Sequence, residues 1–571
     1  MSDLAPARPN YRAGRRFWRL AVDYWNGSNK WTVRGAVLLL LALTVAQVVL
    51  AVWISYWHRD LFDALEAHSL DEFVRLIVMF ALIFAVTMGV TALHLYVKRW
   101  LQLDWRRWMT GMFLDQWLAR SHHYRLQLTA GEHDNPDGRI AEDVKIATEV
   151  AITLAHSLVF SVLVLGSFVD ILLSVSGSAP LPGTSVSVPG YLVLMAFLYA
   201  GVGSVLGLLL GRPLIRTTNR LQTVEANLRF GLARVREHSE AIALVHGGPR
   251  ERLHAGQLFA DVGMGWNRQT VAYLGIVAFS TGYGALLPVF PILIAAPQYI
   301  AGAMTLGLLM QAAQAFQRLT SALSWPIDNL GEIARCRASI DRIITFHEDM
   351  KQLAREDAED ERGTRRIVLR RDEQADLEIR NLCLESASGQ RLLNDFNLVA
   401  HHGERLLFTG DQTVTVALFK TVAGLWPWGR GEILLPAGCD IMFVPLHPYL
   451  YAGTLREVLS YPGAAGLYSN ASFHRALECA GIRWLQTHLD DFEDWGRTLP
   501  LPTQQRLGMA RLFLQQPQWV FIEELADAFD SRDEADTLEL LHHELPGATL
   551  LNISRHLGSG HFYNRHFELR V

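Results

Sequence analysis

Cysteine is scarce in this sequence, and its scarcity narrows the kinds of site to expect. The 571 residues include four widely separated cysteines, with no C-x-x-C pair: Cys336, Cys383, Cys439 and Cys479. Disulfide frameworks and zinc sites need cysteines at close, regular spacing, so neither is predicted and no metal is expected. We expect buried, reduced thiols.

The chain also lacks a large excess of positive or negative charge. Lys and Arg number 52 against 57 Asp and Glu, a formal net charge of −5. This value averages a lipid-embedded half and a soluble half, so it does not identify a partner. Both signs are mixed within residues 347–375, which indicates a solvated linker and argues against a nucleic-acid partner.

The third absence is a lysine at the phosphate-binding position of a stretch framed like a phosphate loop. Residues 408–429 read FTGDQTVTVALFKTVAGLWPWG, an apolar strand end followed by a helix-like run. A working loop, G-x-x-x-x-G-K-[ST], surrounds phosphates with backbone N–H groups and adds a Lys and a Mg²⁺-binding hydroxyl. Counting back from Gly424 places Thr415 at the Lys position and Val416 after it. Counting forward from Gly410 places Val416 at the Lys position, so neither count finds a lysine.

The first 346 residues do contain long apolar runs. Half of the chain is hydrophobic, which favours a membrane protein. We predict a basic cytoplasmic segment (1–34), then a transmembrane domain (35–346), with both termini in the cytoplasm. Its six predicted spans lie at about 35–57, 73–97, 147–175, 191–210, 273–295 and 301–320.

Between the spans, residues 100–146 and 212–270 are charged and are predicted to form long cytoplasmic helical extensions. Acidic residues after the first span (Asp60, Asp63, Glu66, Asp71 and Glu72) are assigned to an outer loop. From residue 376 short strands alternate with helices, which predicts an α/β domain over 376–571.

Two passages of the membrane half identify a family resemblance. They read LDWRRWMTGMFLDQWL, followed by YRLQLTAGEHDNPDGRIAED, and EANLRFGLARVREHSEAIAL over 225–244. Together with LMQAAQAF and GLWPWG, they resemble the SbmA/BacA-like branch of ABC transporters, which includes YddA-type proteins. Asn227, Leu228 and Gly138 depart from the usual pattern.

The resemblance implies a multi-domain chain: an all-α six-helix transmembrane domain of the ABC exporter type, then an α/β nucleotide-binding domain. It also implies a homodimer with swapped helices in the bacterial inner membrane. Substrates in this branch include peptides, cobalamin and other bulky solutes. Some members lack the nucleotide domain and are driven by protons.

The resemblance also assigns the ATP-site positions, and most have lost the group that acts on nucleotide. These positions are Gly410, Thr415, Val416, Leu446, Pro500, Pro502, Glu523, Glu524, Asp530 and Arg555. Leu446 replaces the glutamine of the Q-loop, and two prolines remove N–H donors from the signature motif. Arg555 takes the place of the switch histidine, unless a one-residue gap brings His556 there.

Glu524 stands where the catalytic base belongs, and Glu523 replaces the Mg²⁺-ordering aspartate. Because phosphoryl transfer depends on positioned charge, we expect no appreciable ATP hydrolysis and no cofactor. ATP with Mg²⁺ is expected as a ligand only if the degenerate site still binds it.

Ionisable residues of the membrane half are candidates for coupling transport to another gradient. They are Glu225, Arg229, Arg236, Glu240, Asp170 and His94, with His156 and Glu149 near them in the third span. The first four are predicted to share one helix face, as either an ion-pair ladder or a proton-sensitive gate. For the others, snorkelling or interhelical bonding is the alternative to a proton relay.

Three functional hypotheses remain open. The first is a transporter of peptides or other bulky solutes, driven by protons. The second is a half-transporter that relies on a catalytically competent second ABC subunit. The third is a membrane scaffold that transports nothing.

Overall fold

The computed structural model describes residues 13–27, 29–128, 135–176, 178–180, 187–361, 367–372, 376–523, 531–554 and 562–570. The chain divides into two compact units. The first consists of residues 1–116 and 132–348 and is helical, and the second consists of 117–131 and 349–571 and is mixed.

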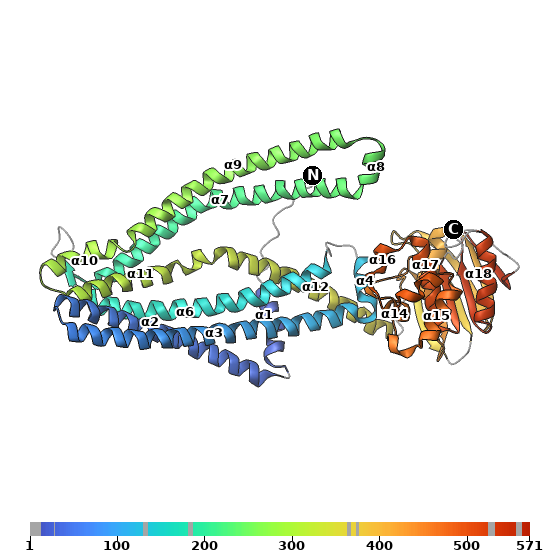
Figure 1. Ribbon diagram of the computed structural model, residues 1–571, viewed down its shortest axis with the longest axis horizontal. Helices are drawn as coiled ribbons and strands as arrows, with labels where there is room; N and C mark the ends of the chain where they lie inside the picture. Colours follow the sequence, from blue (N-terminus) through green and yellow to red (C-terminus); the bar gives the residue numbers. More distant parts are fainter. Residues whose placement is uncertain are drawn as a thin grey trace. The chain divides into compact units, whose positions relative to one another are not determined.

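Long helices build the first unit (Figure 1). They are α1 (Ala13–Trp25), α2 (Lys30–Glu66), α3 (Leu70–Leu118), α6 (Val144–Ser176), α7 (Tyr191–Glu237), α8 (Ser239–Leu244), α9 (Gly248–Leu286), α10 (Phe290–Ile300), α11 (Leu306–Asp328) and α12 (Leu330–Glu361). Two short strands, β1 (Ser178–Pro180) and β2 (Ser187–Pro189), pair between α6 and α7.

Within the described residues, five helical stretches are long and apolar enough to cross a membrane. They are Lys30–Glu66, Leu70–Leu128, Pro136–Ser176, Tyr191–Glu237 and Gly248–Ile300. The predicted sixth span corresponds to α11, which is not among them, so the count of six stays a prediction. The core of this unit contains α11: its Phe316 and Leu319 pack with Phe168 of α6 and Leu192 of α7, all fully buried.

The acidic residues assigned to an outer loop lie instead on helices, and two of them cap α11. Asp63 and Glu66 belong to the last turns of α2. Asp63 accepts a hydrogen bond from the Gly307 N–H at 3.0 Å, and Glu66 accepts one from Leu306 at 2.9 Å. Carboxylates at a helix N-terminus satisfy free N–H donors and complement the helix dipole, so they fix α2 against α11.

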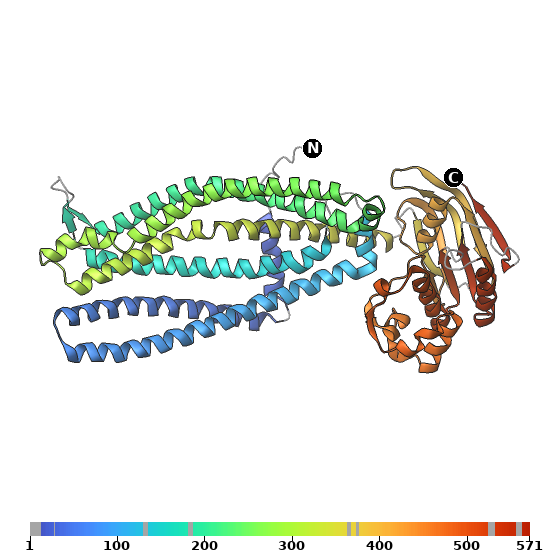
Figure 2. The same ribbon diagram turned by 45° about the horizontal axis from the view of Figure 1, so that its top comes forward.

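The helices α7 and α9 form a long hairpin closed by α8, and they run side by side in both views (Figure 2). Many large apolar side chains of the hairpin are exposed, including Phe230, Val245, Leu253, Phe259 and Val271. A surface of this kind indicates a partner or lipid contact.

Two sheets form the frame of the second unit. A parallel five-stranded sheet has the order β13-β6-β12-β11-β8, and a mostly antiparallel four-stranded sheet has the order β3-β7-β4-β5. The bounds of these strands are β3 Ile367–Asp372, β4 Leu377–Glu385, β5 Arg391–Ala400, β6 Arg405–Gly410, β7 Gly429–Pro436, β8 Ile441–Val444, β11 Trp519–Glu523, β12 Thr549–Ile553 and β13 Arg565–Leu569.

Helix α13 (Gln412–Val422) contacts strands of both sheets. Its Val414, Ala417 and Leu418 are buried in one apolar cluster with Ile379 of the second sheet and Phe408 of the first. The helix is therefore a central packing element of the unit.

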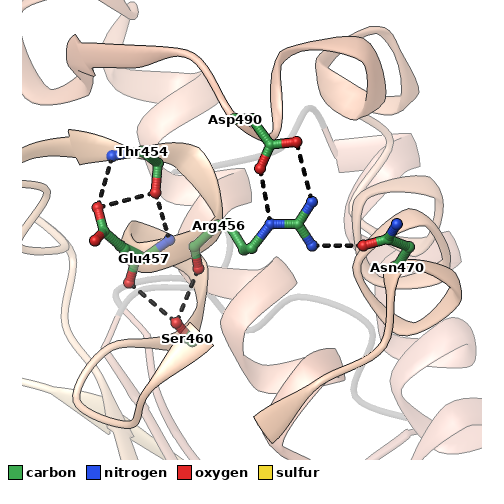
Figure 3. A network of polar contacts seen from close by, with 6 residues as sticks. All are labelled: Thr454, Arg456, Glu457, Ser460, Asn470 and Asp490. Atoms are coloured by element: carbon green, nitrogen blue, oxygen red, sulfur yellow. Dashed lines mark hydrogen bonds and ion pairs between the residues drawn. The ribbon is translucent and has the colours of Figure 1, made fainter. Parts of the chain in front are cut away.

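A smaller helical part carries its own core and is bordered by a short two-stranded antiparallel sheet. Its elements are β9 (Ala452–Thr454), α14 (Leu455–Ser460), α15 (Asn470–Cys479), β10 (Phe492–Asp494), α16 (Trp495–Thr498) and α17 (Leu501–Gln515), and α18 (Ser531–Glu544) packs against this core. Figure 3 shows how polar contacts hold α14: Thr454 and Glu457 form a capping box, and Arg456 binds Asp490 and Asn470.

The stretch 347–375, predicted as a linker, contains the end of α12 and strand β3. In the same unit, α4 (His122–Leu128) is tied to α12 by ionic contacts. Buried Asp357 of α12 accepts a contact from His122 Nε2 at 2.8 Å and also binds Arg125, which reaches Glu356 at 2.7 Å.

Candidate functional site

In the stretch framed like a phosphate loop, a single residue separates the strand from the helix. Strand β6 ends at Gly410, Asp411 is the N-cap, and α13 begins at Gln412. The Asp411 Oδ1 accepts a hydrogen bond from the Thr413 N–H at 2.7 Å. A backbone N–H group at the start of this helix, the type of donor that cradles phosphate, is therefore used by the chain's own carboxylate.

Thr415 and Val416, the predicted degenerate positions, lie inside the first turns of α13. Thr415 is buried, and its hydroxyl donates to the Gln412 carbonyl at 3.2 Å. The lysine of α13, Lys420, lies in its last turn, with Nζ 5.9 Å from the ring centroid of Tyr124. No lysine lies in the first turn of this helix, and the Thr415 hydroxyl is bonded within the helix.

Gly410 is held against the last strand of the sheet. Its φ is +128°, and a Cβ there would lie 1.9 Å from the Leu569 carbonyl oxygen. The Asp411 N–H donates to the same oxygen at 3.0 Å. The glycine thus serves a close backbone approach within the sheet.

The Q-loop and Walker B positions bond to each other. The Glu523 Oε2 lies 3.4 Å from the Leu446 backbone N, and Gln505 Nε2 donates to the Leu446 carbonyl at 3.2 Å. In this arrangement Glu523 acts as a bridge between β11 and the segment after β8, and Leu446 offers no polar side chain to a metal-bound water.

A helix begins at the signature position, where few backbone N–H donors are present. Pro500 is the N-cap of α17, and Pro502 lies in its first turn. Proline is tolerated there because these N–H groups have no partner within the helix, but it removes the donors that a phosphate would use. Gln504 points back to the chain and donates to the Gly496 and Leu499 carbonyls, each at 2.8 Å.

Three predicted positions, Glu524, Asp530 and Arg555, lie outside the described residues. Next to them, Ser554 is buried and its N–H donates to the Phe408 carbonyl at 2.9 Å. Within the described residues no group of three or more His, Cys, Asp or Glu side chains could hold a metal ion. At the start of α13, the Asp411 carboxylate accepts the Thr413 N–H, and no lysine stands at position 415 or 416.

The coupling candidates of the membrane half are mostly exposed and are not brought together. Glu225, Arg229 and Arg236 lie on α7, which ends at Glu237, whereas Glu240 lies on α8. The predicted stripe is therefore divided by a helix break, and all four side chains are exposed. Asp170 is exposed on α6.

His94 is the exception, because it is buried and meets His156. The two ring centroids lie 4.2 Å apart, and the rings come from α3 and α6. The sequence singled out both histidines but gave no sign that they touch.

The sequence analysis missed the role of Asp411. A signal for it was present, since an aspartate directly before a run with helical apolar spacing is a common N-cap. Matching residues 408–429 to a phosphate loop assigned Asp411 to the loop, so its role as an N-cap was not predicted.

Comparison with known proteins relates the chain to ABC transporters. Residues 23–285 match the family described as ABC transporter transmembrane region 2. The chain is 26% identical to the inner membrane ABC transporter ATP-binding protein YddA of Escherichia coli over 545 residues, which cover 94% of both chains. It is 25% identical to ABC transporter D family member 2, chloroplastic, of Arabidopsis thaliana, covering 97% of this chain and 86% of that one. It is 22% identical to the lysosomal cobalamin transporter ABCD4 of Mus musculus, covering 93% and 91%.

Proposed function

We propose that this chain, which is similar to ABC half-transporters of the YddA and ABCD type, moves a bulky solute across the bacterial inner membrane without hydrolysing ATP. The observation that carries the proposal is the Asp411 cap, which uses an N–H group at the start of α13. The solute is a peptide or a cobalamin-like molecule, and the cobalamin transporter among the relatives supports the second class.

Loss of hydrolysis is supported at separate points of the second unit. The α13 N-terminus has no lysine and is capped, Leu446 has no polar side chain, and Pro500 and Pro502 remove donors at α17. Phosphoryl transfer is catalysed almost wholly by positioned charge, so losses at all these points remove the means of catalysis.

A competent partner subunit is the weaker alternative. In an ABC heterodimer each composite site takes its phosphate loop from one chain and its signature from the other. Since both elements are altered in this chain, both composite sites would be affected. The scaffold hypothesis predicts no flux under any gradient, and the transport experiment below separates it from the first.

A homodimer is the proposed assembly. The apolar residues Phe230, Leu253 and Phe259 are exposed in 212–270, which lies outside the spans predicted from the sequence. In a dimer, the α7–α9 hairpin of the second copy would cross that of the first and cover this surface. The charged stripe of α7 lies beside the surface. Phe230→Glu should shift the purified protein from dimer to monomer in mass photometry, whereas Arg229→Gln, a change at an exposed neighbour, should not.

The energy source is proposed to be a proton gradient. Purified protein reconstituted in liposomes should take up a labelled peptide when ΔpH is imposed without ATP, and a protonophore should abolish that uptake. Uptake that requires ATP and is indifferent to ΔpH would refute the proposal. Uptake under neither condition favours the scaffold.

A further inference from the structure

His94 and His156 form an isolated imidazole pair in the membrane half. The rings are 4.2 Å apart with planes tilted by 47°. His94 is 5% exposed, and the Nε2 atom of each ring is buried with no hydrogen-bond partner among the described residues. Buried polar atoms are nearly always paired, so two orphaned nitrogens side by side call for an explanation.

The pair has a cation near it but makes no ion pair with a carboxylate in the described part of the chain. Lys98 lies one turn after His94, and its positive charge interacts electrostatically with both rings. The charged groups nearest to the pair along α3 and α6 also include Arg99, Asp104, Lys145 and Glu149, and Asp104 accepts a hydrogen bond from Tyr24 of α1.

A cavity and a polar seam connect the pair to its surroundings. His156 lines a largely apolar cavity of about 330 Å³, together with Trp105, Leu101 and other residues of α1, α2, α3 and α6. Along the seam between α3 and α6, Gln102 Nε2 donates to the Glu149 carbonyl at 2.9 Å and to Thr153 Oγ1 at 3.1 Å. Along α3, the seam lies between His94 and the basic residues Arg106 and Arg107.

We propose that His94 and His156 are one shared proton-binding site, which takes up a single proton and couples it to solute movement. The proton adds to an Nε2 lone pair and returns to water, so no other bond changes. Histidine is the side chain that changes charge near neutral pH, and an ionisable group inside a membrane span is a functional candidate. Two imidazolium charges this close in an apolar site repel, so the pair holds one proton rather than two. This inference rests on the proposed function for its role in transport, but its proton stoichiometry does not.

The first test counts protons. Full-length protein in nanodiscs is titrated from about pH 8 to about pH 5, the range in which histidine titrates. The His94→Gln/His156→Gln double variant should take up one proton per chain fewer than the wild type. Each single variant should lose none, because the remaining imidazole binds the proton. His254→Gln, at an exposed histidine of α9, is the control for removing a histidine outside the pair. A deficit of two or of zero protons in the double variant overturns the proposal.

The second test links the site to transport. Peptide uptake driven by ΔpH should fall at least tenfold in the double variant, while His254→Gln transports normally; the size-exclusion profile verifies folding. If uptake runs on ΔpH and the double variant transports normally, the coupling role is wrong and the proposed function stands. If uptake depends on ATP while the pair still binds one proton, the proposed energy source is wrong and the site stands.

Discussion

The Asp411 carboxylate accepts a hydrogen bond from the Thr413 backbone N–H at 2.7 Å. The residue directly follows the strand that would lead into a phosphate loop, and it caps the helix that would follow one. A negative charge already fixed at a helix N-terminus both uses its donors and repels a second anion. This contact is the local reason to expect no nucleotide chemistry in this domain.

ATP turnover should be absent. The purified wild type with Mg-ATP should release phosphate no faster than Glu524→Gln, which removes the carboxylate at the catalytic-base position. Millimolar Mg-ATP should also leave the thermal unfolding midpoint unchanged, since a ligand stabilises only a fold that binds it. Turnover above that of the variant would contradict the assignment.

Two changes at Asp411 should separate its cap from its charge. Asp411→Ala should lower the free energy of unfolding by about 1 kcal/mol, the typical cost of a lost N-cap. Asp411→Asn should lower it by much less, because the amide oxygen can accept the same hydrogen bond. Chemical denaturation of the full chain in detergent measures both. Equal losses in the two variants would mean that the charge, and not the cap, stabilises α13.

Replacing Gly410 should be severe. Gly410→Ala combines a positive φ with a Cβ placed 1.9 Å from the Leu569 carbonyl, so about 3 kcal/mol or more of stability should be lost. Gly424→Ala is the matched control, with φ +74° and open space around its Cβ, and should cost about 1 kcal/mol. A mild effect at Gly410 would show that β13 moves away easily.

The α14 network should make the second unit sensitive to acid. Hydrogen bonds from the Thr454 backbone and side chain hold the pKa of Glu457 below its usual value, and the hydrogen bond from Arg456 does the same for the pKa of Asp490. A carboxylate with a lowered folded-state pKa contributes stability above its unfolded pKa of about 4 and loses it as pH falls through the folded value. Denaturation midpoints should therefore drop below about pH 4, less steeply in Glu457→Gln than in the wild type. Glu539→Gln, at an exposed carboxylate, should retain the wild-type slope.

The α2–α11 junction should tolerate no added methyl group. At Gly307 a Cβ would lie 2.2 Å from the Arg59 carbonyl oxygen, whereas at Gly331 nothing lies within 4 Å. Gly307→Ala should lower the unfolding free energy by about 3 kcal/mol, as overpacking does, and Gly331→Ala by far less. Thermal unfolding in detergent compares them, and similar midpoints would show that the junction adapts.

The sequence by itself determined the chemistry that this protein lacks and the kind of chain it is. Residue identity alone shows that no lysine stands at position 415 or 416 and that prolines stand at the signature, because a missing donor is missing in any fold. Apolar runs longer than a soluble helix needs likewise indicate membrane helices, and strand–helix alternation after residue 376 indicates an α/β unit.

Only the tertiary structure decided how residues distant in the sequence meet. Asp63 and Glu66 reach the start of α11, and His94 of α3 meets His156 of α6. Neither contact has a local signal, because each depends on how separate helices pack. The same packing divides the predicted α7 stripe, since a helix break before Ser239 places Glu240 on α8.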